Sequence, residues 1–77
     1  MTTWTEITEE RYDEMLGALP PAVWTVVGFL VGEPMDHDPV TSLPRYSAFA
    51  QANGKFYAAN EVMTAREFRA VKVEDVK

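Results

Sequence analysis

The sequence contains no cysteine and a single histidine, His37, among its 77 residues. Disulfides and thiolate metal sites are therefore excluded, and no second histidine is present to complete a usual zinc site. Long hydrophobic runs are also missing, since the most apolar stretch, Ala22 to Val31, falls far short of the roughly 20 residues that span a bilayer. The polar, acidic start "MTTWTEITEE" lacks the features of a signal peptide. We therefore expect a soluble, cytoplasmic protein that forms a single domain over residues 1–77 and makes no contact with membranes.

Positive charge is scarce as well, particularly in the first half of the chain. The net charge is −5. Residues 1–44 contain eight carboxylates against Arg11 alone, which gives −7, whereas residues 45–77 contain six basic residues against four acids, which gives +2. An acidic surface repels nucleic acid and attracts basic surfaces. We therefore predict no direct binding of nucleic acid, and a partner that is a host protein or nucleoprotein complex with a basic surface.

The residue patterns of common catalytic sites do not occur in the sequence. There is no G-x-S-x-G nucleophile elbow, and "VGFLVGEP" lacks the lysine and the spacing of a phosphate-binding loop. His37 is the only imidazole that could serve as the base for a serine or threonine nucleophile. A domain this small can scarcely build the cleft that a pair of catalytic carboxylates needs. We therefore predict no enzymatic activity, no catalytic residues and no cofactor.

The stretch "EPMDHDP", residues 33–39, places three carboxylates and the histidine close together with two prolines. Imidazole and carboxylates are ligands for zinc or manganese, but adjacent residues rarely converge on one ion, so we predict no metal site. The alternative is a solvated turn in which aspartate side chains accept hydrogen bonds from nearby backbone amides. We expect this acidic turn to lie beside the N-terminal helix and to extend its negative field.

That helix is the clearest local pattern in the chain. Thr8 can cap it, and Glu9 and Glu10 then occupy the first turn, where the helix dipole favours negative charge. Pro20-Pro21 should end the helix near Ala18. Apolar side chains recur at helical spacing and should face the core; they are Tyr12, Met15, Leu16 and Leu19. Carboxylates occupy the opposite face; they are Glu9, Glu10, Asp13 and Glu14.

Three further patterns complete the predicted fold. "AVWTVVGFLVG" predicts one central strand closed by its last glycine, and Gly28 within it indicates a bulge or a close approach by another backbone. Asn53-Gly54 predicts a type I′ turn between two alternating strands. Thr64 and Glu67 predict a capping box that opens a short helix, and the tail "VKVEDVK" leaves open a short strand or a frayed end. The order predicts an α+β domain with a three-stranded antiparallel sheet packed against an N-terminal helix, and a short C-terminal helix.

Two surfaces are candidates for partner binding. The first is acidic and combines the polar face of the helix with the acidic stretch; its residues are Glu9, Glu10, Asp13, Glu14, Glu33, Asp36 and Asp38. The second is an aromatic hairpin, where alternation places large side chains on both faces; its residues are Tyr46, Phe49 and Tyr57. An aromatic surface suits contact with another protein or with a second copy of the chain. The predicted state is therefore a monomer or a homodimer.

Four segments, "ALPPAVW", "GFLVGEPMDH", "PRYSAF" and "GKFYAANEVMTAREF", resemble in that order a family of short proteins of unknown function from proteobacterial plasmids and prophages. The resemblance covers roughly residues 8–70, and the family has no catalytic residues to carry over. Its members often continue past the histidine with a basic residue and a cysteine, where this sequence has Asp38 and Pro39. That departure weakens any metal or redox role taken from the family.

What the resemblance implies is a mobile genetic element, where small acidic proteins often bind and disable host machinery. In size and charge the chain is similar to anti-CRISPR proteins. The leading prediction is a non-enzymatic acidic binding protein of a phage or plasmid, most concretely an anti-CRISPR inhibitor that acts as a DNA mimic and blocks DNA binding by a host CRISPR effector complex. The alternative is a small accessory or regulatory protein of a mobile element that acts through the aromatic hairpin.

Overall fold

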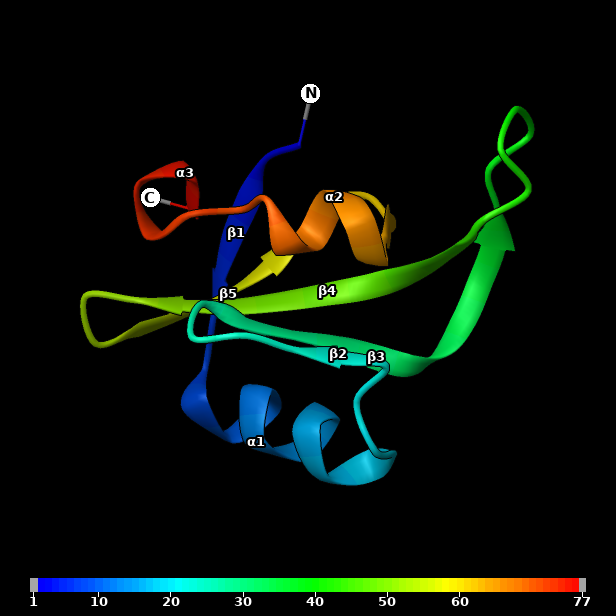
Figure 1. The fold of residues 1–77 in the computed structure, drawn as a ribbon. Coiled ribbons are helices and arrows are strands. Elements are labelled where there is room, and N and C mark those ends of the chain that lie inside the picture. Colours follow the sequence, from blue (N-terminus) through cyan, green and yellow to red (C-terminus); the bar gives the residue numbers. More distant parts are fainter. Residues whose placement is uncertain (1, 77) are drawn as a thin grey trace.

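An antiparallel sheet forms the centre of the computed structural model, which describes residues 2–76 (Figure 1). Within these residues the sheet has six strands, which are β1 (Trp4–Ile7), β2 (Val23–Trp24), β3 (Gly28–His37), β4 (Pro44–Ala52), β5 (Lys55–Ala59) and β6 (Met63–Thr64). Three helices accompany them, which are α1 (Glu9–Ala18), α2 (Ala65–Arg69) and α3 (Val73–Val76). The strand order is β1-β5-β4-β3-β2, and β6 pairs with β4 outside this path. α1 covers one face of the sheet, and α2 and α3 lie on the other (Figure 1).

The prediction of a three-stranded sheet is wrong, and sheet rather than helix dominates residues 2–76. β1 and β6 contain four and two residues, too few for an alternating pattern to stand out in the sequence. Both are defined by distant partners: Trp4 lies opposite Ala59 of β5, and Met63 lies opposite Tyr46 of β4. Such pairings depend on the folded chain and leave little local signature.

The stretch predicted as one central strand turns back on itself at Thr25. The Thr25 hydroxyl accepts hydrogen bonds from the N–H groups of Val27 (3.2 Å) and Gly28 (3.4 Å), and the Thr25 N–H donates to the Gly28 carbonyl (2.8 Å). This turn makes β2 an edge strand and β3 an interior one. The predicted close approach at Gly28 is confirmed, because a Cβ there would overlap the carbonyl oxygen of Phe49.

β3 continues through Pro34 to His37 instead of ending at Gly32. Past the residues that pair with β2, β3 continues to pair with the first residues of β4, and the register of this pairing shifts between Leu30 and Asp36. The two strands project from the body as an arm (Figure 1). Proline is tolerated there because this part of β3 has no neighbour on its outer side among the described strands. The predicted acidic turn is therefore mostly strand, and the turn itself begins at Asp38.

α1 begins after Thr8 and ends at Ala18, as predicted. The Thr8 side chain accepts a hydrogen bond from the backbone of the first turn, which confirms the cap. Tyr12 is buried and packs edge-on against Phe29, with 5.2 Å between the ring centroids. Leu19 lies past the end of the helix and is exposed, so the predicted apolar stripe stops one residue earlier.

The sheet divides the core into two layers. On the α1 side the buried residues are Tyr12, Phe29 and Phe49. On the other side the buried residues are Val23, Leu30, Ala48, Met63 and Phe68, together with Val27, Ala50, Ala52 and Val76. The alternation predicted for the hairpin strands is confirmed by this division. Because α2 contributes Phe68 and α3 contributes Val76, each short helix is attached to the sheet by one buried side chain.

Two local signals of the C-terminal half are confirmed and one is not. Asn53 and Gly54 both have positive φ (53° and 75°) in the turn between β4 and β5. Thr64 and Glu67 form the capping box of α2. The tail is neither strand nor frayed end, because residues 73–76 form α3; residue 77 lies outside the described residues.

Candidate functional site

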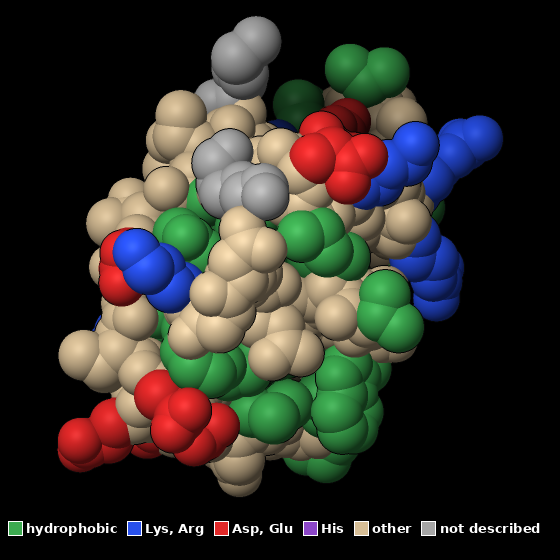
Figure 2. Space-filling model, turned by 90° about the vertical axis from the view of Figure 1, so that its left-hand side faces the viewer, with side chains coloured by type: hydrophobic (Ala, Val, Ile, Leu, Met, Phe, Trp, Pro, Cys, Tyr) green, Lys and Arg blue, Asp and Glu red, His purple; other side chains and the backbone are tan. Residues whose placement is uncertain are grey.

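α1 exposes four carboxylates, which are Glu9, Glu10, Asp13 and Glu14. We call them the acidic face. Within residues 2–76 the only ion pairs are Asp36–Arg45 and Glu6–Lys55, so the acidic face carries four charges without an ion-pair partner. Figure 2 shows one group of acidic side chains at the lower left, where α1 lies, and another near the top beside Lys and Arg side chains, which lie mainly towards the upper right. The acidic face is therefore a free negative surface.

Of the acids in the stretch 33–39, only Glu33 stays near α1. It follows Gly32, which lies directly against the carbonyl of Pro20, just beyond the end of the helix. The arm carries the rest of the stretch away, and its tip points away from α1 (Figure 1). The expectation that the whole stretch extends the field of the helix is therefore wrong.

Asp36 forms an ion pair across the arm. Arg45 Nε donates to Asp36 Oδ1 (2.7 Å) and Arg45 Nη2 donates to Oδ2 (2.8 Å), while the two residues face each other in the strand register. These hydrogen bonds lower the pKa of Asp36 and raise the pKa of Arg45. Such bidentate pairing is the geometry that favours arginine over lysine. Asp36 is thus occupied within the molecule.

Asp38 shapes the tip of the arm. Its Oδ1 accepts hydrogen bonds from the N–H groups of Val40 (2.8 Å) and Thr41 (3.0 Å), and Ser42 adopts a positive φ of 63°. The bonds from Thr41 and then Val40 lower the pKa of Asp38. This is the backbone-bonding turn predicted as the alternative to metal binding. Within residues 2–76 no group of three or more His, Cys, Asp or Glu side chains is arranged to hold a metal ion.

Acid titration should reveal both contacts of the arm. The two carboxyls should have midpoints below the ordinary 3.8, since each is bonded in its charged form. A lowered pKa in the folded state gives stability that is present above the unfolded pKa and is lost as the pH falls through the folded value. The contacts should therefore persist at neutral pH and disappear only below about pH 4. Carboxyl-detected NMR would measure each midpoint.

The matched control for this titration is Arg45→Gln. It should return the midpoint of Asp36 towards 3.8 and leave that of Asp38 lowered, because backbone amides rather than Arg45 dominate there. An Asp36 midpoint that is unchanged in the variant would contradict the ion pair.

The predicted aromatic surface is largely part of the core. Phe49 is only 5% exposed and stacks on Phe29, with 5.4 Å between the ring centroids, so it cannot serve as an interface residue in the folded chain. Tyr46 and Tyr57 are half-buried and pack against the other core layer. Alternation alone could not show that both faces of this hairpin are covered. The large aromatic that is exposed is Trp24 of β2, at 70%.

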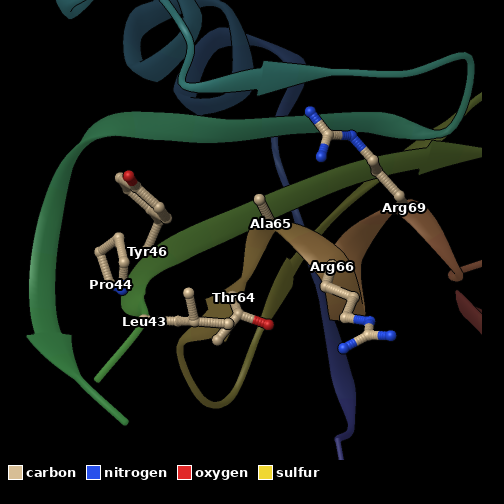
Figure 3. A pocket seen from close by; sticks show the side chains of 7 residues that line it. All are labelled: Leu43, Pro44, Tyr46, Thr64, Ala65, Arg66 and Arg69. Carbon is tan, nitrogen blue, oxygen red and sulfur yellow. The ribbon is translucent and has the colours of Figure 1, made fainter. Parts of the chain in front are cut away.

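A pocket that the sequence did not indicate lies between α2 and the β4 side of the arm. Its volume is about 230 Å³, and its walls are formed by Leu43, Pro44, Tyr46, Thr64, Ala65, Arg66 and Arg69. We call it the α2 pocket. In Figure 3, Pro44 and Tyr46 lie on one side of it, and Arg66 and Arg69 extend from α2 on the other. Its residues come from three separate elements, so no contiguous motif marks it; the one local signal is the pair of arginines three residues apart.

A second hollow, of about 270 Å³, lies where β5 ends and the chain bulges before β6. The polar side chains along this bulge are already bonded to the start of the chain: Asn60 Oδ1 accepts from the Thr3 N–H (2.7 Å), and Glu61 Oε1 accepts from the Thr2 hydroxyl (2.8 Å). Asn60 and Glu61 therefore anchor the segment before β1 at the edge of this hollow.

No protein-family model, curated protein or solved structure matches the chain. The resemblance to plasmid and prophage proteins therefore stays a prediction, and the fold and the surface chemistry are what inform the function. Among residues 2–76 there is no helix with the length and apolar character needed to span a membrane.

Proposed function

We propose that the chain is a non-enzymatic binding protein of a phage or plasmid that uses its acidic face to occupy a basic surface of a host protein or nucleoprotein complex. In its most concrete form it is an anti-CRISPR inhibitor that acts in the host cytoplasm. There it takes the place of DNA on a CRISPR effector complex.

The observation that carries this proposal is the set of four exposed carboxylates on α1, none of which has an ion-pair partner within residues 2–76. Side chains three and four positions apart on a helix lie about 5–6 Å from one another, so they form a short row of negative charges that loosely resembles a row of phosphates. A basic channel built for DNA would attract such a row, and salt would weaken the attraction. We include Glu33 in the proposed surface because the neighbouring Gly32 lies against the carbonyl of Pro20, two residues beyond the end of α1.

Two predicted members are left out of this surface. Asp36 is paired with Arg45, and Asp38 is bonded to the amides of its own turn. Using either carboxylate for a partner would first require breaking these contacts. The aromatic hairpin loses support for the same kind of reason, because Phe49 is occupied in the core.

The test is a plating assay in cells whose CRISPR system targets a phage. Expression of the chain should restore plating of that phage, and a variant with Glu9→Gln, Glu10→Gln, Asp13→Asn and Glu14→Gln should abolish the restoration. Amides are preferred to lysines because positive charge in the first helical turn would oppose the helix dipole and destabilise α1. With purified components, the chain should reduce DNA binding by the effector complex, and raised salt should weaken this inhibition.

The control is a pair of double variants with equal change of charge. Asp13→Asn/Glu14→Gln lies on the acidic face beyond the first turn, and Glu61→Gln/Glu74→Gln lies elsewhere on exposed positions. The first should reduce plating at least tenfold, and the second should leave it unchanged. Full activity of the fourfold variant, with its fold intact by circular dichroism, would refute the electrostatic proposal.

A further inference from the structure

We propose that the α2 pocket binds a small aromatic oxyanion, with the ring against Tyr46, Leu43 and Pro44 and the charged group held by Arg66 and Arg69. This site lies on the opposite face of the sheet from α1 (Figure 1) and is independent of the acidic face.

The apolar side of the pocket is preformed. Tyr46 is half-buried and packs against the core layer that contains Phe68, so its position is set by the fold. Leu43 is 43% exposed, so its side chain is accessible to a ligand in the pocket. Ala65, the first residue of α2, is small and leaves room between these walls and the arginines. A flat apolar group fits such a space, since a ring can pack against both tyrosine and aliphatic carbon.

The cationic side of the pocket is uncompensated. Arg66 and Arg69 are exposed, and neither takes part in an ion pair within the described part of the chain. Glu67 lies between them in the sequence, but its carboxylate faces the helix cap: Oε1 accepts from the Thr64 N–H (3.1 Å) and from the Thr64 hydroxyl (2.9 Å). The capping box therefore holds the Glu67 carboxylate at the start of α2, and Glu67 forms no ion pair with either arginine within residues 2–76.

The position of the arginines is also set by the fold. α2 is attached to the sheet through Phe68, which is fully buried between them in the sequence. With Phe68 inward, the arginines on either side are left at the rim of the pocket (Figure 3). They extend in different directions, so a bound anion would draw at least one of them inward. Exposed side chains change rotamer within nanoseconds, so this movement is rapid.

The side chains that line the pocket and its volume indicate the chemical class of the ligand. Guanidinium groups bind carboxylates and phosphates through paired hydrogen bonds, and they also stack on aromatic rings. The volume of about 230 Å³ lies below the 300–1,000 Å³ typical of drug-sized ligands, so the ligand is small. The third nearby arginine, Arg45, is committed to Asp36 and does not contribute. A single ring with one oxyanion matches the walls, the charge and the size together.

The experiment uses phenyl phosphate and benzoate as probes in an NMR titration of the intact chain, with inorganic phosphate and phenol as comparisons. Phenyl phosphate or benzoate should shift the backbone amides of Tyr46, Ala65 and Arg66 most strongly. The aromatic oxyanions should bind at least tenfold more tightly than inorganic phosphate or phenol, because only they satisfy both sides of the pocket. Which of the two aromatic probes binds better then identifies the source of the oxyanion.

The variant Arg66→Gln/Arg69→Gln should weaken binding of the better probe at least tenfold. Its control is Lys55→Gln/Lys72→Gln, which removes the same charge at exposed positions outside the pocket and should leave binding unchanged. All four positions are exposed, so both variants should keep the wild-type amide spectrum. Equal affinity in the two variants, shifts centred away from the pocket, or inorganic phosphate binding as tightly as the aromatic probes would each overturn the proposal.

Discussion

Replacing Gly28 by alanine should leave the domain largely unfolded. The added methyl group would overlap the carbonyl oxygen of Phe49 and come within 2.6 Å of Ala50 Cα. Both obstacles are backbone atoms of β4, so no side-chain rotation can relieve the overlap, and the main β3–β4 pairing must shift. We expect a loss of at least about 3 kcal/mol. A domain of this length has a free energy of unfolding of roughly 5 kcal/mol, so the loss consumes most of it.

The matched control is the same substitution at Gly17. An alanine Cβ there would meet no atom within 4 Å, and the residue lies in α1 on the exposed side. Alanine favours the helix over glycine by about 1 kcal/mol, so Gly17→Ala should raise the urea concentration at the midpoint of unfolding. Urea unfolding followed by circular dichroism would measure both variants. A stable, cooperative Gly28→Ala protein would contradict the packing of β3 against β4.

Truncating Phe68 to alanine should be the second most damaging change. Its side chain has no exposed surface and packs with Leu30, Ala48 and Met63 beneath α2. Truncation of a buried phenylalanine to alanine lowers the free energy of unfolding by about 3–5 kcal/mol, because apolar burial is lost and a cavity is left behind. α2 has five residues and no other buried side chain, so it should also leave the sheet. The expected result is a strongly lowered unfolding midpoint together with loss of the α2 amide pattern in NMR.

Trp24→Ala provides the contrast for this prediction. The substitution removes a larger aromatic group, but Trp24 is 70% exposed on the two-residue edge strand β2. Its effect on the free energy of unfolding should stay under about 1 kcal/mol. Equal destabilisation by Trp24→Ala and Phe68→Ala would contradict the finding that Phe68 is buried and Trp24 is exposed.

The parts of the fold that the sequence predicts are those controlled by neighbours in the chain. The Thr8 cap, the stop before Pro20, the Asn53-Gly54 turn and the Thr64 capping box all depend on contacts within a few residues. Each has a distinct chemical cause, such as a missing amide donor at proline or positive φ at a turn. These features can therefore be predicted without knowing the rest of the fold.

The number of strands could not be predicted in this way. β1 and β6 exist because β5 and β4 offer them pairing edges, and the chain reverses at Thr25 through a hydroxyl that bonds two backbone amides. A threonine inside a β-branched run looks like part of the strand. The continuation of β3 past Pro34 is equally hidden, since only an unpaired outer edge makes proline acceptable there.

The candidate sites differ in the same way, since one depends on local sequence and the others depend on contacts between distant residues. The acidic face follows from helical spacing alone and could be predicted. The pairing of Asp36 with Arg45 depends on strand register, and the α2 pocket brings together residues from β4, β6, α2 and the loop before β4. The capping box was predictable, but its position next to the α2 pocket was not, because that requires knowing where Arg66 and Arg69 lie.

The sheet that separates α1 from α2 is a single layer, so the molecule has two outward surfaces of different character on opposite sides (Figure 1). A partner seated on the acidic face would leave the α2 pocket facing the surrounding solution. Both surfaces could then be occupied at once without steric competition. In that case the domain would have two binding sites that can be occupied together. Any effect of one ligand on the affinity for the other would have to be transmitted through the strands of the sheet.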